Sequence, residues 1–264
     1  MQIVKYLYTS EHKIFGELKY TSEISSDYTK HFHTQFGLAL IEQGQLNISY
    51  EKDNQYSLEK HSIAFFNPYQ VHCTTVSNAK GYYILFLDTA WCSSLQKDFY
   101  FETNILHDET LYSTLYSLFQ TILHQGVVMS VEEELRTIMK NMFKHYTSKN
   151  TQQKSQTVLD IKSYIDRNSA TTLSIDDLAS YVGYNKSYLI RFFKKEVGLT
   201  PQQYILNIKV NKAKELLTYA NKESLTSISL DTGFFDQSHF NRNFKGLFGS
   251  TPKHYKKVNI VQDK

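Results

Sequence analysis

Hydrophobic and polar residues change their spacing at about residue 108 of the 264-residue chain. Before that point, between residues 14 and 87, apolar residues come in short runs rich in β-branched and aromatic side chains, such as 36–41 and 82–87. Turn sequences separate these runs, at 42–44, 53–54, 67–68 and 78–81. Short apolar runs bounded by Gly, Asn and Pro are typical of strands, and several at this spacing favour a β-sandwich or a small barrel.

After Asp108 the apolar residues follow the period of an amphipathic helix. They form two stripes, the first at Leu111, Leu115, Leu118, Phe119 and Ile122, the second at Leu135, Ile138, Met139 and Met142. Two such helices either pack on their own domain or pair two subunits. We interpret 108–146 as a helical segment for dimerisation and coupling, and the pattern leaves simple packing open as the alternative.

A polar stretch at 147–156 contains no apolar residue and is the best candidate for a linker. Beyond it, the spacing indicates helices only. The sequence therefore predicts an α+β protein of two domains, a β-barrel with two helices followed by an all-α domain. We place the barrel at 1–107, the helical segment at 108–146, the linker at 147–157 and the all-α domain at 158–264.

The composition excludes several other classes of protein. With 41% hydrophobic and 21% charged residues, 20 Tyr and 17 Phe, the chain is typical of globular proteins with well-filled cores. No window comes near the ~18 apolar residues of a membrane-spanning helix, and the first residues lack the apolar run of a secretory signal. Cys73 and Cys92, the only cysteines, have no spacing typical of a zinc site. We expect a cytoplasmic protein with reduced thiols and no membrane partner.

Positive charge is concentrated in the predicted all-α domain. Residues 158–264 contain 16 Lys and Arg against 10 Asp and Glu, which leaves 13 against 16 in the rest of the chain. A basic domain joined to a mildly acidic one suggests a polyanion as partner for the basic half. Charge alone is weak support, because most charged residues simply face solvent.

The all-α domain contains an internal repeat. The segment 174–201 recurs at 224–252, with an offset of 50 residues up to Gly183 and Gly233 and of 51 residues after them. The second turn therefore has one extra residue. Both copies end in Gly-x-Thr-Pro, at 198–201 and 249–252.

Each position of the repeat has a physical reason. Ser174 and Ser224 are candidate N-caps, and Asp177 completes a capping box. Gly183 and Gly233 suit the left-handed residue that ends a helix. The next helix then has one apolar face and one basic face. The apolar residues are Leu189 and Phe193, or Phe240 and Phe244; the basic ones are Arg191 and Lys194, or Arg242 and Lys245.

A helix, a turn with glycine and a basic helix form the signature of a helix-turn-helix unit. We place the two units near 174–195 and 224–246. Pro201 opens a long helix to about Tyr219 that joins them. Recognition helices ~34 Å apart enter successive major grooves on one face of B-DNA.

Residues 158–257 resemble the DNA-binding domain of the AraC/XylS family of bacterial regulators. The segment 233–252, which reads Gly-Phe-Phe-Asp-Gln-Ser-His-Phe and continues through Phe244-Lys245 to the final Thr-Pro, is similar to the family's hallmark. Ser229 stands where the family usually has alanine, and serine is nearly as small.

The resemblance assigns base-reading and phosphate-contacting roles to particular residues. The base-reading positions are Ser187, Tyr188, Ile190, Arg191, Gln237, Ser238, His239, Asn241 and Arg242. Arg suits guanine, Gln and Asn suit adenine, and an apolar side chain suits the thymine methyl group. The expected phosphate contacts are Lys186, Lys194, Lys195, Lys245 and Lys253. For each base-reading side chain, the alternative is a phosphate contact or simple exposure to solvent. For the two arginines, a structural salt bridge is a further alternative.

Three histidines are the candidate site of the N-terminal domain. The order His31, His33 and, after a proline turn, His72 is similar to the cupin barrel found in many members of the family. The metal-binding pattern of cupins has an acidic residue where Gly37 and Leu38 stand here. We therefore expect a cupin-like effector pocket lined by the three histidines, with no metal and no cofactor. Histidines that only close the barrel are the alternative.

The sequence thus predicts a transcription regulator and no enzyme. Its expected partners are double-stranded DNA, a small-molecule effector, RNA polymerase and a second copy of the chain. The alternative is a metal-dependent cupin enzyme with an accessory helical domain. A third interpretation is a regulator whose N-terminal domain only oligomerises.

Overall fold

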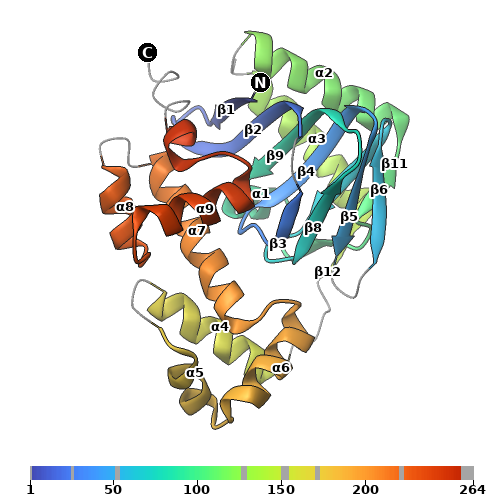
Figure 1. Ribbon diagram of the computed structural model, residues 1–264. Coiled ribbons are helices and arrows are strands. Elements are labelled where there is room, and N and C mark those ends of the chain that lie inside the picture. The colour runs from blue at the N-terminus through green and yellow to red at the C-terminus, as the bar shows by residue number, and fades with distance from the viewer. Residues whose placement is uncertain are drawn as a thin grey trace. The chain divides into compact units, whose positions relative to one another are not determined.

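The computed structural model describes residues 2–24, 27–50, 54–125, 130–149, 155–169, 173–219 and 223–256. The chain divides into two compact units, one rich in strands and one mainly helical (Figure 1). The helical unit begins at Gln152 and also includes the short segments Tyr28–His31 and Val71–Cys73. The end of the predicted all-α domain, 257–264, lies outside the described residues. None of the described helices is long and apolar enough to cross a membrane.

The strands form two main sheets. The larger has the strand order β1 (Gln2–Tyr8), β2 (Ile14–Glu23), β9 (Lys80–Leu87), β4 (Phe36–Gln43), β7 (Ser62–Phe66) and β11 (Ile105–His107). The smaller has the order β3 (Tyr28–His31), β8 (His72–Val76), β5 (Gln45–Tyr50) and β6 (Gln55–Glu59). A third, two-stranded sheet pairs β10 (Phe99–Phe101) with β12 (Thr147–Lys149). The strands predicted at 36–41 and 82–87 are confirmed, whereas β1 precedes the region in which the sequence pattern predicted strands.

The central strands of the larger sheet are buried on both faces. On β4, Leu38 and Leu40 belong to one core cluster, and Ala39 and Ile41 belong to another. The antiparallel partner β9 alternates in the same way, with Leu38 opposite Leu85 and Ala39 opposite Ile84. Since successive side chains of a strand point to opposite faces, a strand covered on both faces needs an unbroken apolar run.

Three helices cover one face of this sheet: α1 (Thr89–Leu95), α2 (Glu109–Gln125) and α3 (Ser130–Tyr146). Both apolar stripes predicted from the sequence lie in the core cluster that these helices form with β4, β7 and β9. The stripes are therefore occupied within the chain, and packing on the helices' own domain is what the structure shows. Of the predicted linker, Thr147–Lys149 form β12 and α4 begins at Gln156, while 150–154 lie outside the described residues.

A polar network also joins α2 to the sheet. The Tyr83 hydroxyl on β9 donates a hydrogen bond to a carboxylate oxygen of Glu42, and the Tyr116 hydroxyl on α2 donates to the same oxygen at 3.2 Å. The amide nitrogen of Gln120 donates to the Tyr83 hydroxyl oxygen at 2.6 Å. Burial and the Glu42 carboxylate raise the pKa of Tyr83.

The second unit contains, in chain order, the helices α4 (Gln156–Asn168), α5 (Ile175–Val182), α6 (Lys186–Val197), α7 (Pro201–Tyr219), α8 (Leu225–Asp231) and α9 (Gln237–Phe248), and residues 252–256 are helical as well. The long helix predicted from Pro201 to about Tyr219 is confirmed as α7. Its residues Val210, Ala213 and Leu217 share one core cluster with Phe240 and Phe244 of α9. The second helix pair is therefore packed directly on α7.

Candidate functional site

The first helix pair, α5 and α6, has the predicted capping and turn. The Ser174 hydroxyl accepts a hydrogen bond from the Asp177 N–H at 3.1 Å, and the Asp177 carboxylate accepts from the Ser174 N–H at 2.9 Å, so the capping box is confirmed. Gly183 has a φ of 69°. The Tyr184 N–H then donates to the Ala179 carbonyl at 3.0 Å, which closes the turn as a Schellman motif.

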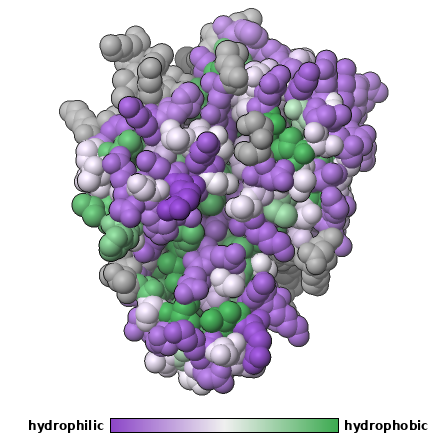
Figure 2. Space-filling view, viewed as in Figure 1, coloured by the Kyte–Doolittle hydropathy of each residue, from purple (hydrophilic) through white to green (hydrophobic). Residues whose placement is uncertain are grey.

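The second pair, α8 and α9, repeats this geometry with one extra residue. Ser224 caps α8, Gly233 has a φ of 74°, and the Phe234 N–H donates to the Ser229 carbonyl at 2.9 Å. Ser229 is buried, as expected for a residue in alanine's place. The extra residue is Phe235, whose side chain is 91% exposed. Figure 2 shows a mainly hydrophilic face in this region, with a hydrophobic patch where Figure 1 places α8.

Side-chain caps determine where the two recognition helices begin. The side-chain amide oxygen Oδ1 of Asn185 accepts from the Tyr188 N–H at 2.9 Å, and the Asp236 carboxylate accepts from the His239 N–H at 2.6 Å. These two caps were not among the residues predicted from the sequence. Their signal was present, since Asn and Asp are preferred N-caps and the two positions are related by the repeat.

Most predicted base-reading side chains lie on the outer surfaces of α6 and α9. The exposed ones are Ser187, Tyr188, Arg191, Gln237, Ser238 and Arg242, and the half-buried ones are Ile190, His239 and Asn241. The apolar residues of the same helices are fully buried, including Leu189 on α6 and Phe240 on α9. Each recognition helix thus separates a buried face from a face that can meet a ligand.

Two of these positions also pack against the preceding turn. The Tyr188 ring lies edge-on to Tyr184, with ring centroids 4.8 Å apart, and the equivalent His239 lies edge-on to Phe234 at 5.5 Å. In both units the aromatic residue after the turn glycine therefore supports the side chain at the third position of the recognition helix. This contact restricts the directions in which Tyr188 and His239 can point.

The arginines and lysines predicted to contact DNA differ in whether they form ion pairs within the chain. Within the described part of the chain, neither Arg191 nor Arg242 forms an ion pair, so the structural salt bridges considered as their alternative are not observed. Lys186 lies 3.0 Å from the Asp176 carboxylate, and both side chains are exposed. The predicted Lys194, Lys195, Lys245 and Lys253 are exposed as well.

Other lysines of the basic domain have a structural role. On α7, the Lys209 ammonium donates to the Gly233 carbonyl at 2.7 Å, and burial lowers the pKa of Lys209. Lys212 donates to the Ser169 hydroxyl. Fewer positive charges are therefore available to a polyanion than the net charge of the domain suggests, because these two lysines are hydrogen-bonded between α7 and neighbouring turns.

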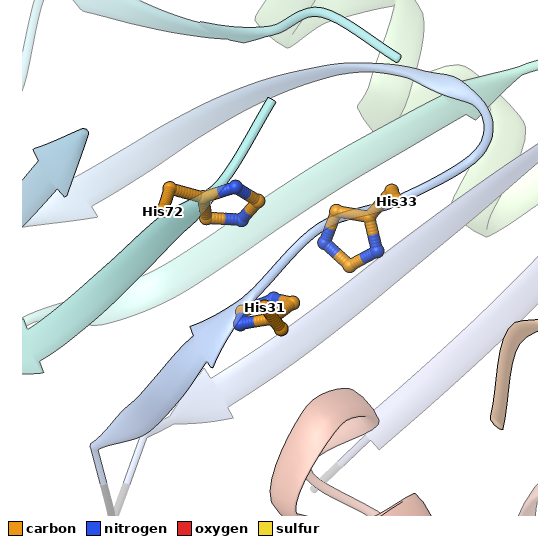
Figure 3. Close-up of side chains that lie close together, drawn as sticks. All are labelled: His31, His33 and His72. Atoms are coloured by element: carbon orange, nitrogen blue, oxygen red, sulfur yellow. The ribbon is translucent and has the colours of Figure 1, made fainter. Parts of the chain in front are cut away.

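The three candidate histidines of the N-terminal half of the chain lie close together. His31 ends β3, His72 begins the neighbouring strand β8, and His33 lies in the connection from β3 to β4. All three are buried, and one ring nitrogen from each lies within 4.8 Å of the others. Figure 3 shows the three rings turned toward a common space. Among the described residues, no carboxylate or thiol joins this group.

Neighbouring groups orient two of these rings. Nδ1 of His31 lies 2.6 Å from the Thr29 carbonyl oxygen. The His33 ring stands edge-on to Phe86, with centroids 4.6 Å apart, and also contacts Phe66. Gly37, where the cupin pattern has its acidic residue, is packed so closely that an added Cβ would stand 3.2 Å from Phe66. The site is therefore three imidazoles on an apolar wall.

Comparison with known proteins gives two family matches and a set of relatives. Residues 17–139 match the AraC-like ligand binding domain, and residues 178–257 match a helix-turn-helix domain. The uncharacterized HTH-type transcriptional regulator YbfI of Bacillus subtilis (strain 168) is 26% identical over 235 residues, which cover 82% of each chain.

Solved structures share the fold over nearly the full length of the chain. ToxT from Vibrio cholerae O395 aligns with a TM-score of 0.60 at 14% identity, covering 98% of this chain and 97% of ToxT. A form of ToxT from strain SCE256 bound to an unsaturated fatty acid gives 0.58 at 15% identity, with 98% and 95% covered. At this identity the likeness shows a common fold.

Proposed function

Because the chain belongs to the AraC/XylS family of transcriptional regulators, we propose that α6 and α9 read two DNA half-sites under the control of a small molecule. The chain is a regulator with an N-terminal ligand-binding domain and a C-terminal helix-turn-helix domain. We keep 1–107, 108–146, 147–157 and 158–264 as the proposed effector, coupling, linker and DNA-binding segments. An enzymatic role is not proposed, since the matched families and relatives describe regulators.

The duplicated recognition helix is the observation that carries this proposal. Arg191 and Arg242 occupy the same position of α6 and α9, and both are exposed. An exposed guanidinium on such a helix suits O6 and N7 of guanine. We propose that Gln237 and Asn241 read adenine and that Ile190 contacts a thymine methyl group. The exposed lysines of the same region contact phosphates and determine the position of each helix.

The two units carry different side chains at equivalent positions. Ile190 of α6 corresponds to Asn241 of α9, and Tyr188 corresponds to His239. Two half-sites read by one chain in the same direction therefore form a direct repeat of unequal sequences, not a palindrome. Replacing one half-site at a time in a bound duplex shows which unit supplies more of the affinity.

The N-terminal domain supplies the response to a ligand. It matches a ligand-binding family, and ToxT, which shares its fold, has a form bound to an unsaturated fatty acid. We propose that His31, His33 and His72 belong to the effector site. A ligand changes DNA affinity only if it binds two states of the protein with different affinity. A homodimer, contact with RNA polymerase and a cytoplasmic location complete the proposed role.

Substitution of the two arginines tests the DNA interface. A duplex is first selected from random sequences with the full-length chain, and its affinity is measured by fluorescence anisotropy over a range of salt concentrations. We expect Arg191→Ala and Arg242→Ala each to weaken binding by about 1–3 kcal/mol and to relax specificity at one base pair. Binding by the unchanged chain should fall steeply with salt.

Arg167 provides the matched control. It is an exposed arginine of the same unit, on α4 and outside both helix pairs. Arg167→Ala removes the same charge and should leave the affinity for the selected duplex within about twofold, since a distant surface charge contributes only weakly at physiological salt. Equal losses for Arg167→Ala and for the two recognition-helix variants would show that only general charge is read.

A further inference from the structure

The histidine cluster has the composition of a metal site. We propose that His31, His33 and His72 bind one divalent transition metal ion of the zinc class. This inference deepens the proposed function, on which it rests for the identity of the effector site, by naming the chemical class of the ligand. The absence of the cupin acidic residue led us to expect no metal, but it does not remove the three nitrogen ligands.

The separations of the ring nitrogens are compatible with one shared ion. Nitrogen atoms no more than 4.8 Å apart leave a common point at most about 2.8 Å from each of them, whereas zinc–nitrogen bonds are about 2.0–2.1 Å long. Each ring therefore needs to move inward by less than about 1 Å, which small side-chain rotations supply. The three side chains come from two paired strands and one connection, and their rings face a common position (Figure 3).

The hydrogen bond of His31 orients the ring as in known metal sites. A carbonyl oxygen can only accept, so the 2.6 Å contact with Thr29 places the proton of a neutral His31 ring on Nδ1. The lone pair then lies on Nε2, the ring atom through which His31 would bind a metal. A ring N–H held by a backbone carbonyl is the usual outer contact of a histidine that binds a metal, because it determines both tautomer and ring direction.

The surroundings favour some ions over others. Three imidazoles without a carboxylate suit zinc, copper, iron and nickel, whereas magnesium and calcium prefer oxygen ligands. The ring contacts of His33 with Phe86 and Phe66 provide an apolar shell on one side. Such a shell limits water at the site and strengthens the metal–imidazole interaction. Three protein ligands also leave a fourth coordination position, as in catalytic zinc sites.

Metal titration of the full-length chain tests the proposal. The chain is prepared without a histidine tag, stripped with a chelator and titrated with zinc sulfate in a calorimeter. We expect one ion per chain. Cobalt(II) in place of zinc should produce the strong visible absorption of a four-coordinate site, a measurement on the unchanged chain that does not depend on how any variant folds.

Variants identify the ligands. His33→Gln and His72→Gln should each weaken zinc binding by at least about 100-fold, more than the loss of an outer contact does, with circular dichroism confirming that they fold. His145→Gln is the control, because His145 is an exposed histidine of α3, and it should bind zinc like the unchanged chain. Zinc binding that is equally strong in His33→Gln, or no binding by the unchanged chain, would overturn the proposed site.

Operator binding separates this inference from the proposed function. A chain that binds the selected duplex but takes up no zinc contradicts the metal site and leaves the regulator role standing. A chain that binds one zinc ion but no duplex contradicts the proposed DNA interface and leaves the metal site standing. A zinc-dependent change in duplex affinity that is lost in His33→Gln supports both.

Discussion

Single residues make the two helix pairs alike. In each pair a serine caps the first helix, a glycine with positive φ ends it, and Asn185 or Asp236 caps the second. These contacts are local, because each joins residues within a few positions of one another. Such contacts explain why the units could be found from the spacing of a few residue types.

Two glycines of this domain should respond to alanine in opposite ways. An alanine Cβ meets no atom within 4 Å at either Gly183 or Gly246, but only Gly183 has a positive φ. Gly183→Ala should therefore lower the free energy of unfolding by about 1–2 kcal/mol through backbone strain alone. Gly246→Ala, inside α9, should raise it by about 0.5–1 kcal/mol. Urea denaturation of the full-length chain measures both, and a shift of the same sign in the two variants would contradict this account.

At the scale of elements, α2 is joined to the sheet by apolar packing and by tyrosine hydroxyls. Leu115, Phe119 and Ile122 fill the core between helix and sheet. The Tyr112 hydroxyl donates to the Ile41 carbonyl at 2.7 Å, and Tyr116 donates to Glu42. The helix is thus hydrogen-bonded directly to the end of β4, with no loop between them.

These buried tyrosines predict a loss of stability at high pH. Burial raises the pKa of Tyr112 to about 12, above the value of ~10 for tyrosine in an unfolded chain. The unfolded state then loses its proton first, so the contribution of Tyr112 is complete below pH ~10 and is lost as pH rises toward 12. Thermal unfolding between pH 8 and pH 11.5 should show a shallower decline for Tyr112→Phe than for the unchanged chain. Parallel curves would mean that Tyr112 titrates alike in both states.

At the scale of the whole molecule, the chain joins a ligand-binding domain to a DNA-binding domain. Regulation then consists of a coupling free energy between the two binding sites, and it is reciprocal: a ligand that strengthens DNA binding is itself bound more tightly on DNA. The apolar faces of α2 and α3 are buried within the chain. A proposed dimer therefore uses surfaces other than those stripes.

The folded chain should consequently not depend on dimer formation. We expect the Tm of the full-length protein to stay constant within about 1 °C over a hundredfold range of protein concentration, because a stable monomer is not stabilised by mass action. Differential scanning fluorimetry at low concentration and calorimetry at high concentration cover this range. A Tm that rises steadily with concentration would show that folding and assembly are linked, as in an obligate dimer.

Much of the fold was predictable because its signals are local. Apolar periodicity and turn residues within short windows predicted the strands at 36–41 and 82–87. The same kind of local signal predicted the helix from Pro201 to about Tyr219. β1 was missed since its seven residues, Gln2–Tyr8, carry no turn signal before them. The role of Lys209 was missed because its partner, the Gly233 carbonyl, lies 24 residues away in the turn of the second helix pair.

The sequence by itself therefore determined the two domains, the repeated helix pairs and the residues that cap them, because helix period, caps and turn glycines act between near neighbours. Only the tertiary structure decided which apolar stripes are core and which lysines are structural. It also brought His31 and His33 beside His72, which is distant in the sequence. The physical reason is strand pairing: β3 and β8 become neighbours through long-range hydrogen bonds, and no local pattern specifies which strands meet.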